Sequence, residues 1–364
     1  MVKLYLRNRT ASPLLVVLLG LTLCKAAVAS WNAGLPDVIF RLPAGAWSSG
    51  MGGASLANPE YMVSWYNPSS LPLLRERRAS LGAGLRSLGR TEGWASYDFR
   101  VPPRVGMGLS FVYRGDPFVN NLYDGYYDDK GNVIEENELN GAAWSAVSFK
   151  IAAGYIVSRR VSAGGSVSVN YQSLPTTPGS HGSVKNTTIT SIGALDIMAS
   201  YRASSNLMLS AGIKNLLSRN SWQITSFDNF SPYHNETVPP VFVFGSSHKT
   251  SLFERELVWN VDAQSYFFDG EGKYIGHPEL VIAAGGRWKF TEDFSLRAGF
   301  SDLDLSGEIY RNSSEYWETF SPRICLGFSY HLQRLRQGMN FNYALTTDRI
   351  WAGVDQQFDF TVSF

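Results

Sequence analysis

The sequence predicts an all-β fold, a 14-stranded antiparallel transmembrane β-barrel with a small N-terminal hatch. Three observations predict this class. About fourteen segments alternate apolar and polar residues with period two, and the charges within them keep to one face. The connections between these segments alternate between short turns and long loops, as they do in barrels of the bacterial outer membrane.

A secretory signal peptide is predicted over residues 1–29. Basic residues lie within positions 1–9, an apolar run follows at 13–23, and small residues stand at Ala27 and Ala29, as is typical of a cleavage site. The apolar run is shorter than the roughly 20 residues that a membrane-spanning helix needs. The segment therefore directs export and is expected to be removed.

The hatch is predicted over residues 30–74, because residues 38–74 do not alternate and are rich in Gly, Ala, Ser and Pro. Small residues suit a confined space, and irregular backbone exists at membrane depth only where protein or water satisfies its polar groups. We expect Asn67 to hydrogen-bond to the barrel wall and Pro68 to fix a bend. The alternative is a periplasmic tether ahead of the barrel. The candidate hatch residues are Gly50, Gly52, Gly53, Asn67 and Pro68.

The barrel is predicted over residues 75–364. Turn residues separate its strands at regular spacing, and only the segment 241–247 fails to alternate clearly. The predicted strands are 78–87, 93–100, 105–114, 144–157, 161–173, 190–202, 207–216, 241–247, 257–267, 280–290, 294–300, 322–331, 338–345 and 354–364.

The two faces of these strands differ in charge. In "AVSFKIAAGY" (146–155) the residues Val147, Phe149 and Ile151 share one face, and Ser148 and Lys150 share the other. An Arg or Lys at the lipid midplane costs about 2–4 kcal/mol, so the face that carries charge is expected to line the lumen. The lumen-facing candidates are Lys150, Asp196, Lys214, Asp262 and Arg287.

The connections predict the orientation. Those after even-numbered strands are mostly short, and those after odd-numbered strands are mostly long, at 115–143, 174–189, 217–240, 268–279, 301–321 and 346–353. Short turns are typical of the periplasmic side of such barrels. An even number of strands returns the chain to the same side.

The last strand, "QQFDFTVSF" (356–364), is predicted to pair with the first strand near 78–87 and so close the barrel. Its apolar face is expected to contact lipid, since an unpaired apolar strand edge favours aggregation. A terminal strand of this kind resembles the signal that the barrel assembly machinery recognises in bacterial outer-membrane proteins. The residues of this face are Phe358, Phe360, Val362 and Phe364.

No catalytic, metal or cofactor site is predicted, and the chain is not expected to be an enzyme. The five histidines form no metal-binding spacing, and the acidic loop at 122–139 departs from the calcium-loop pattern. Cys24 does not fit a lipoprotein signal, because Leu23 precedes it where a small residue is expected. Cleavage after Ala29 would leave Cys325 as the one cysteine, predicted to be a buried thiol.

Other classes are less consistent with the sequence. The net charge of +1 supplies no basic field for nucleic acid. A secreted β-sandwich or propeller would also alternate and carry a signal peptide. The alternation of short and long connections and the aromatic residues at the strand ends favour the membrane barrel.

The segment "GMGGASLANPEYMVSWYNPSSL" (50–71) resembles the hatch of FadL-type outer-membrane barrels, with the family's Asn-Pro at Asn67 and Pro68. Ser69 and Ser70 stand where that family has Ala-Gly. More closely, the chain resembles the PorV/PorQ family of the same superfamily. Further segments that resemble this family are "LMLSAGIKNLL" (207–217), "ELVWNVDAQSYF" (256–267), "GGRWKFTEDFSLRAGF" (285–300) and "MNFNYAL…FDFTVSF" (339–364).

The resemblance implies a multi-pass barrel in the outer membrane of a Gram-negative-type bacterium, embedded in outer-membrane lipid. It implies transport, with hydrophobic small molecules as cargo that the barrel passes or presents. The alternative is a partner-binding barrel of a type IX-like secretion system that handles secreted proteins at the cell surface. A minor alternative is an outer-membrane enzyme.

Overall fold

A computed structural model gives the fold of the chain. It describes residues 42–116, 122–127, 133–139, 144–174, 184–226, 233–268, 277–304, 322–332, 338–347 and 353–364. The predicted signal peptide and residues 30–41 of the predicted hatch lie outside this part of the chain.

Fourteen strands make up the wall of the molecule. Their bounds are β1 (Arg78–Leu85), β2 (Thr91–Val101), β3 (Val105–Asp116), β6 (Trp144–Ile156), β7 (Val161–Leu174), β8 (Val184–Arg202), β9 (Leu207–Leu216), β12 (Val241–Leu252), β13 (Arg255–Phe268), β14 (His277–Lys289), β15 (Phe294–Asp304), β16 (Arg323–His331), β17 (Met339–Thr347) and β18 (Val354–Ser363).

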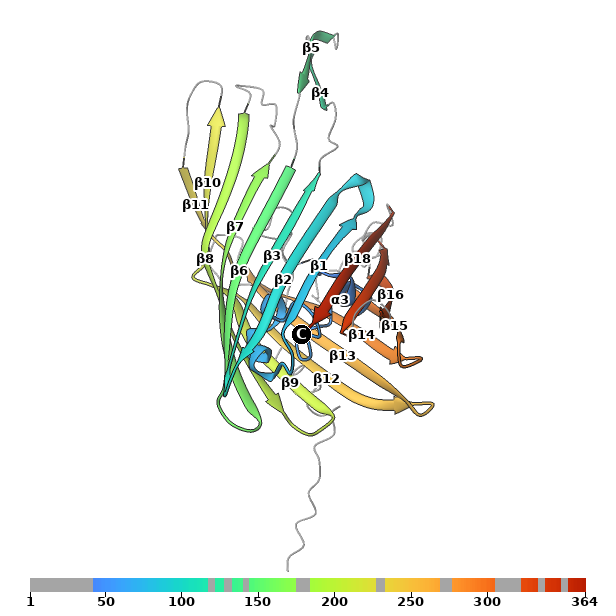
Figure 1. Cartoon of the computed structure of the whole chain (residues 1–364). Coiled ribbons are helices and arrows are strands. Elements are labelled where there is room, and N and C mark those ends of the chain that lie inside the picture. Colours follow the sequence, from blue (N-terminus) through green and yellow to red (C-terminus); the bar gives the residue numbers. More distant parts are fainter. Residues whose placement is uncertain are drawn as a thin grey trace, which may run out of the picture.

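These strands form a closed antiparallel barrel (Figure 1). Neighbours along the chain pair with one another, β8 pairs with β9, and β18 pairs with β1 in the register Arg78↔Ser363 to Leu85↔Gln356. The closure predicted for the last strand is therefore confirmed. Closure pairs the backbone N–H and C=O groups of every strand edge within the ring. The interior of a membrane requires this because it offers these groups no water.

Two hairpins were not predicted, and both fall in segments expected to be loops. The strands β4 (Leu122–Tyr127) and β5 (Val133–Leu139) form a separate two-stranded sheet above the barrel in Figure 1. The strands β10 (Arg219–Ser226) and β11 (Tyr233–Thr237) add to the edge of β8 beyond the end of β9. A free strand edge is a template for pairing, which explains why the segment after β9 continues as strand.

Several predicted boundaries differ from the structure by a few residues, and two of them by five or more. The strand β8 begins at Val184 and not at 190, because β10 pairs with its added residues. The strand β12 continues to Leu252 and not to 247, because the polar stretch after Ser247 pairs with β13 as far as Arg255. In both places the partner strand overrides the local sequence pattern.

The outward face of the barrel is apolar. Ile151 is 50% exposed, whereas the neighbouring Lys150 faces inward and is 8% exposed. The same alternation recurs in β18, where Phe358 and Phe360 face outward and Asp359 is buried. A closed barrel with this surface is an outer-membrane β-barrel, since its apolar exterior needs lipid.

Aromatic side chains form a continuous strip at the end of the barrel that carries the short turns. Successive ring centroids lie 5.2–6.5 Å apart. Such girdles mark the boundary between lipid and water. The strip consists of Phe253, Trp288, Phe290, Phe294, Phe328, Phe341 and Phe360.

The helices are short and precede or follow β1. They are α3 (Ala46–Gly50), α4 (Val63–Tyr66), and the 3-10 turns η1 (Pro68–Leu73) and η2 (Ser87–Gly89). Among the described residues, none of the helices has the length and apolar character needed to cross a bilayer.

Candidate functional site

Residues 42–74, called the inner segment below, lie inside the barrel. In Figure 1 their helices appear within the ring of strands, and contacts agree with this placement. The helix α3 packs on β15 to β18, α4 packs on β2, β3 and β6, and η1 packs on β2, β3, β6, β7 and β8. The segment therefore reaches both sides of the lumen wall.

Glycines of the wall bring the inner segment into direct backbone contact. A Cβ atom on Gly285 would overlap the carbonyl of Met51, and one on Gly106 would overlap the backbone of Leu71. In β7, two strands from Gly106 in the ring, a Cβ atom on Gly164 would meet the backbone of Pro68 at 2.5 Å. Only glycine permits so close an approach, so no side chain separates wall and segment at these positions.

Three wall aspartates accept backbone N–H groups of the inner segment. Asp262 accepts from Ser55 at 2.7 Å and from the next residue at 2.8 Å. Asp98 accepts from Val63 at 2.8 Å, and Asp359 accepts from Ala46 at 2.8 Å. These strong, charge-assisted bonds satisfy backbone groups that would otherwise be buried without partners.

Asn67 joins the inner segment to the wall and to itself. Its side-chain amide donates to Ser200 Oγ at 3.0 Å, to Ser210 Oγ at 3.1 Å and to the carbonyl of Leu56 at 2.7 Å. Its carbonyl oxygen accepts from the backbone N–H of Ser69 at 3.0 Å, which begins η1 with Pro68 at the first position. Asn67 is fully buried, and both ends of its side chain are satisfied.

Tyr66 ties α4 to the start of the segment. Its hydroxyl donates to the carbonyl of Ala44 at 2.6 Å and accepts from the N–H of Ala44 at 2.9 Å. Burial raises the pKa of Tyr66 to about 12, so the phenol keeps the proton that it donates.

An ion network holds the first described residues of the segment. Glu92 lies between Arg86 at 2.7 Å and Arg114 at 3.1 Å, and Asp355 lies 2.9 Å from Arg86. Both arginines also donate to the carbonyl of Pro43, at 3.2 and 3.0 Å. The network thus fixes the segment to the turn after β1 and to β2, β3 and β18.

A second ion network lies near the short-turn end. Arg287 of β14 contacts the carboxylates of Glu60 and Glu256, and Arg78 of β1 donates to the backbone carbonyl of Glu60. Glu60 therefore links the inner segment to two parts of the wall that are far apart in the sequence.

The remaining predicted lumen residues also lie on the inner face. Lys150 pairs with Asp196 at 2.7 Å and stands 4.9 Å from the ring centre of Trp65, a favourable cation–π contact. Lys214 is half-buried opposite Val241 in the register of β9 and β12. Of the hatch glycines, Gly52 and Gly53 have positive φ values of 67° and 81°, and Gly50 closes α3.

Asp98 and Asp359 also fall on the charged face of their alternating strands, but sequence reasoning did not select them as site residues. It also missed Glu60 and Glu92 as partners of arginines. A signal was present: a lone carboxylate at an inward position of an alternating strand needs a buried partner. Among the described residues, no cluster of His, Cys, Asp or Glu could hold a metal ion.

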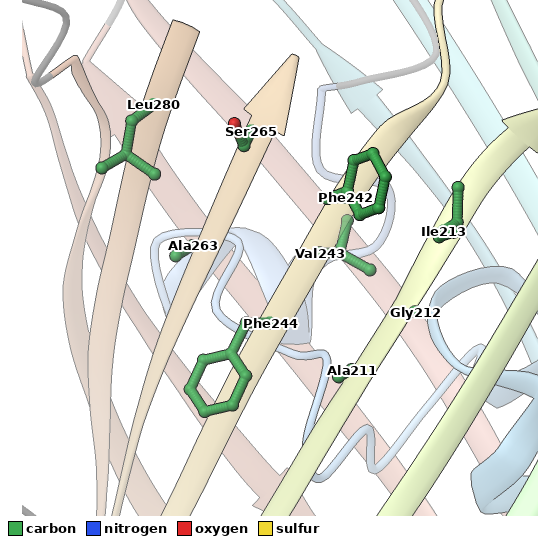
Figure 2. Close-up of a pocket in the computed structure, with 9 residues that line it drawn as sticks. All are labelled: Ala211, Gly212, Ile213, Phe242, Val243, Phe244, Ala263, Ser265 and Leu280. Carbon is green, nitrogen blue, oxygen red and sulfur yellow. The ribbon is translucent and has the colours of Figure 1, made fainter. Parts of the chain in front are cut away.

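An apolar groove of about 360 Å³, the outer groove, lies on the wall at β9, β12, β13 and β14 (Figure 2). Phe242 and Phe244 flank it, and the small side chains of Ala211 and Ala263 leave it hollow. The register pairs these residues with one another on the lipid-facing side. Two inward positions, Gly212 and Val243, form its floor from within the wall. The full lining is Ala211, Gly212, Ile213, Phe242, Val243, Phe244, Ala263, Ser265 and Leu280.

The wall behind the outer groove is apolar on its inner face as well. Leu56 of the inner segment packs with Met198, Val241 and Val243, and Val281 covers this inner cluster. Most inward positions elsewhere on the wall are serine, asparagine or charged residues. The wall at β12 therefore separates two apolar surfaces, one facing the lumen and one facing lipid.

No protein-family model matches the sequence, and no curated protein is significantly similar to it. Solved structures are similar in fold. The Ralstonia pickettii toluene transporter TbuX is 14% identical, with a TM-score of 0.62 over 90% of this chain and 100% of its own. The Pseudomonas putida toluene transporter TodX is 12% identical, with a TM-score of 0.55 over 88% of this chain and 98% of its own.

A FadL homologue from Pseudomonas aeruginosa is likewise 12% identical, with a TM-score of 0.55 over 89% of this chain and 99% of its own. At these identities the similarity shows the fold alone. The chain has the fold of FadL-like outer-membrane barrels.

Proposed function

We propose that this barrel passes a hydrophobic small molecule across the outer membrane, with the inner segment as its hatch. The observation that carries the proposal is the wall at β12, which is apolar on both faces while most of the lumen wall is polar. Apolar cargo gains free energy wherever it leaves water, so it collects on such surfaces. The toluene transporters TbuX and TodX share the fold and support this class of cargo.

The cargo test fills the outer groove. Ala211→Phe places a ring in the groove beside Phe244, the cross-strand neighbour of Ala211, and we expect uptake of labelled toluene by whole cells to fall about tenfold. The matched control is Ala153→Phe, because Ala153 is also an exposed alanine on the outward face of the barrel, in β6. Equal uptake by both variants and the unchanged protein would contradict the proposal.

The hatch test removes the inner segment. Deleting residues 38–70 should leave a conducting pore in planar bilayers, because the wall glycines then face water. If the deleted protein folds, does not conduct and keeps normal uptake, the segment is not a hatch.

A PorV-like role in protein secretion is the second candidate. The hairpin β4–β5 forms its own sheet away from the barrel strands (Figure 1), where a protein partner could reach it. Removing this hairpin should abolish capture of a secretion partner and leave toluene uptake unchanged. Loss of uptake without loss of a partner would exclude this candidate.

A further inference from the structure

The inner segment donates backbone hydrogen bonds to the wall at three points. Asp359 of β18 accepts the N–H of Ala46, and Asp262 of β13 accepts the N–H of Ser55. Asp98 of β2 accepts two consecutive N–H groups, from Val63 at 2.8 Å and from the next residue at 3.1 Å. The three carboxylates belong to separate strands of the ring, so together they hold the segment at distinct points along its length.

The segment has no local substitute for these bonds. Gly45 precedes α3 and has no side chain that could cap it. Met62 precedes α4 and makes no capping bond with its side chain. The helix α3 has 5 residues and α4 has 4. Helices shorter than about 12 residues are marginal in water, so neither would persist away from the wall.

The wall depends on the segment in return. Asp98, Asp262 and Asp359 are 0–3% exposed, and within the described chain none of them has a cation in salt-bridge distance. Asp359 also accepts from Asn342 of β17, at 2.6 Å. Buried carboxylates of this kind need hydrogen-bond donors, and the backbone of the segment supplies them.

We propose that the inner segment is folded only while it is docked, and that it leaves the wall by unfolding and not as a rigid body. When the segment withdraws, its helices lose the carboxylates that accept their first N–H groups. Water in the lumen can then hydrate those carboxylates. Opening of the lumen is then an order-to-disorder transition of residues 44–67. This goes beyond the proposed function, because it concerns how the segment is held whether or not any cargo passes.

The two modes of release differ at backbone amides that bond within the segment. Ser49 N donates to the carbonyl of Gly45 at 3.0 Å, and Asn67 N donates to the carbonyl of Val63 at 2.9 Å. A rigid body would keep these bonds after release, whereas unfolding would break them. Hydrogen exchange at these amides therefore separates the two modes.

The test is hydrogen exchange, read by mass spectrometry, on the full-length barrel in lipid nanodiscs. In the triple variant D98N/D262N/D359N we expect exchange at Ser49 and Asn67 to rise about tenfold or more, together with Ala46 and Val63. The proposal is overturned if Ala46 and Val63 exchange fast while Ser49 and Asn67 stay protected, which is the signature of a rigid body. It is also overturned if no amide of the segment changes.

The matched control is Asp302→Asn. Asp302 is a half-buried wall carboxylate of β15 that pairs with Arg323 of β16 at 3.0 Å, a contact within the wall. We expect exchange within the segment to be unchanged in this variant, and a general rise would show that any loss of wall charge loosens the segment.

If the triple variant does not fold, the unchanged protein gives a second measurement. With rising urea, below the unfolding of the barrel, Ser49, Asn67, Ala46 and Val63 should open with one common dependence on urea. Persistent protection of Ser49 and Asn67 after the others have opened would refute the inference. Neither measurement uses cargo, so a failure here leaves the uptake result intact.

Discussion

Gly285 and Gly286 show that neighbouring residues of the wall can have different structural roles. They are neighbours in β14, but a Cβ atom on Gly285 would overlap the backbone of Met51, whereas one on Gly286 would lie 3.8 Å from its nearest neighbour. The first glycine permits contact with the inner segment, and the second faces outward. A glycine in a strand often marks such a close approach of backbone.

We expect Gly285→Ala to displace the inner segment and to raise the ion conductance of the barrel. The added methyl group has no space against backbone atoms, which cannot rotate away. Conductance in planar bilayers measures the effect, with Gly286→Ala as the control that should behave like the unchanged protein. Equal conductance of the two variants would show that this contact does not seal the lumen.

Glu92 is a second residue whose position matters, in this case for the stability of the barrel. It is fully buried between Arg86 and Arg114. Removing one partner of a buried ion pair costs about 3–5 kcal/mol, because the remaining charge stays buried.

We therefore expect Glu92→Gln to lower the free energy of unfolding by roughly 3 kcal/mol, measured as the urea midpoint of the barrel in lipid vesicles. Glu254→Gln, at an exposed turn position, is the control and should leave the midpoint unchanged. A midpoint of Glu92→Gln equal to that of the control would contradict the importance of this network.

At the scale of elements, the pair β1–β18 is the one that closes the barrel. It joins the first and the last strand of the ring over eight register pairs. Until this pair forms, both strands expose unpaired edges, which are hazardous in lipid and in water alike. Recognition of the outward face of β18 during assembly stays a prediction.

We expect Phe364→Ser to reduce the amount of folded barrel in the outer membrane more than it reduces uptake per folded molecule. Phe364 is 56% exposed, and Phe290, at 50%, is a control aromatic on another part of the wall. Phe290→Ser should therefore assemble normally, as judged by the folded band in membrane fractions. Normal levels of folded Phe364→Ser protein would show that the residue is not an assembly signal.

At the scale of the whole molecule, the closed ring binds fourteen strands into one cooperative unit. The ring has an apolar exterior, an aromatic strip at one end and a polar interior filled by the inner segment. Such a molecule exchanges its lipid for detergent without opening, because every strand edge is paired.

We expect the mature protein in detergent to migrate differently on gels with and without heating, and to show a β-rich circular dichroism spectrum. Both follow from a barrel that stays closed until it is heated. A stable, monomeric and water-soluble mature protein would be incompatible with this fold.

The sequence by itself determined the ring. Strand positions were predictable because the period-two pattern is local: Phe149 and Ile151 face lipid, and Lys150 cannot, whatever the rest of the chain does. Closure through β18 was predictable for the same reason, since a final strand with one apolar face needs a partner in lipid. The hairpin β10–β11 was missed, because its residues become strand only through the free edge of β8.

Only the tertiary structure decided how the lumen is filled. Asp359 and Ala46 are 313 residues apart, yet one hydrogen bond joins them, and no periodicity relates the two positions. Likewise Gly285 and Gly286 are the same residue type in the sequence, although only Gly285 contacts Met51. The physical reason is that alternation fixes the face of a residue, whereas its partner across the lumen depends on the closed shape of the whole barrel.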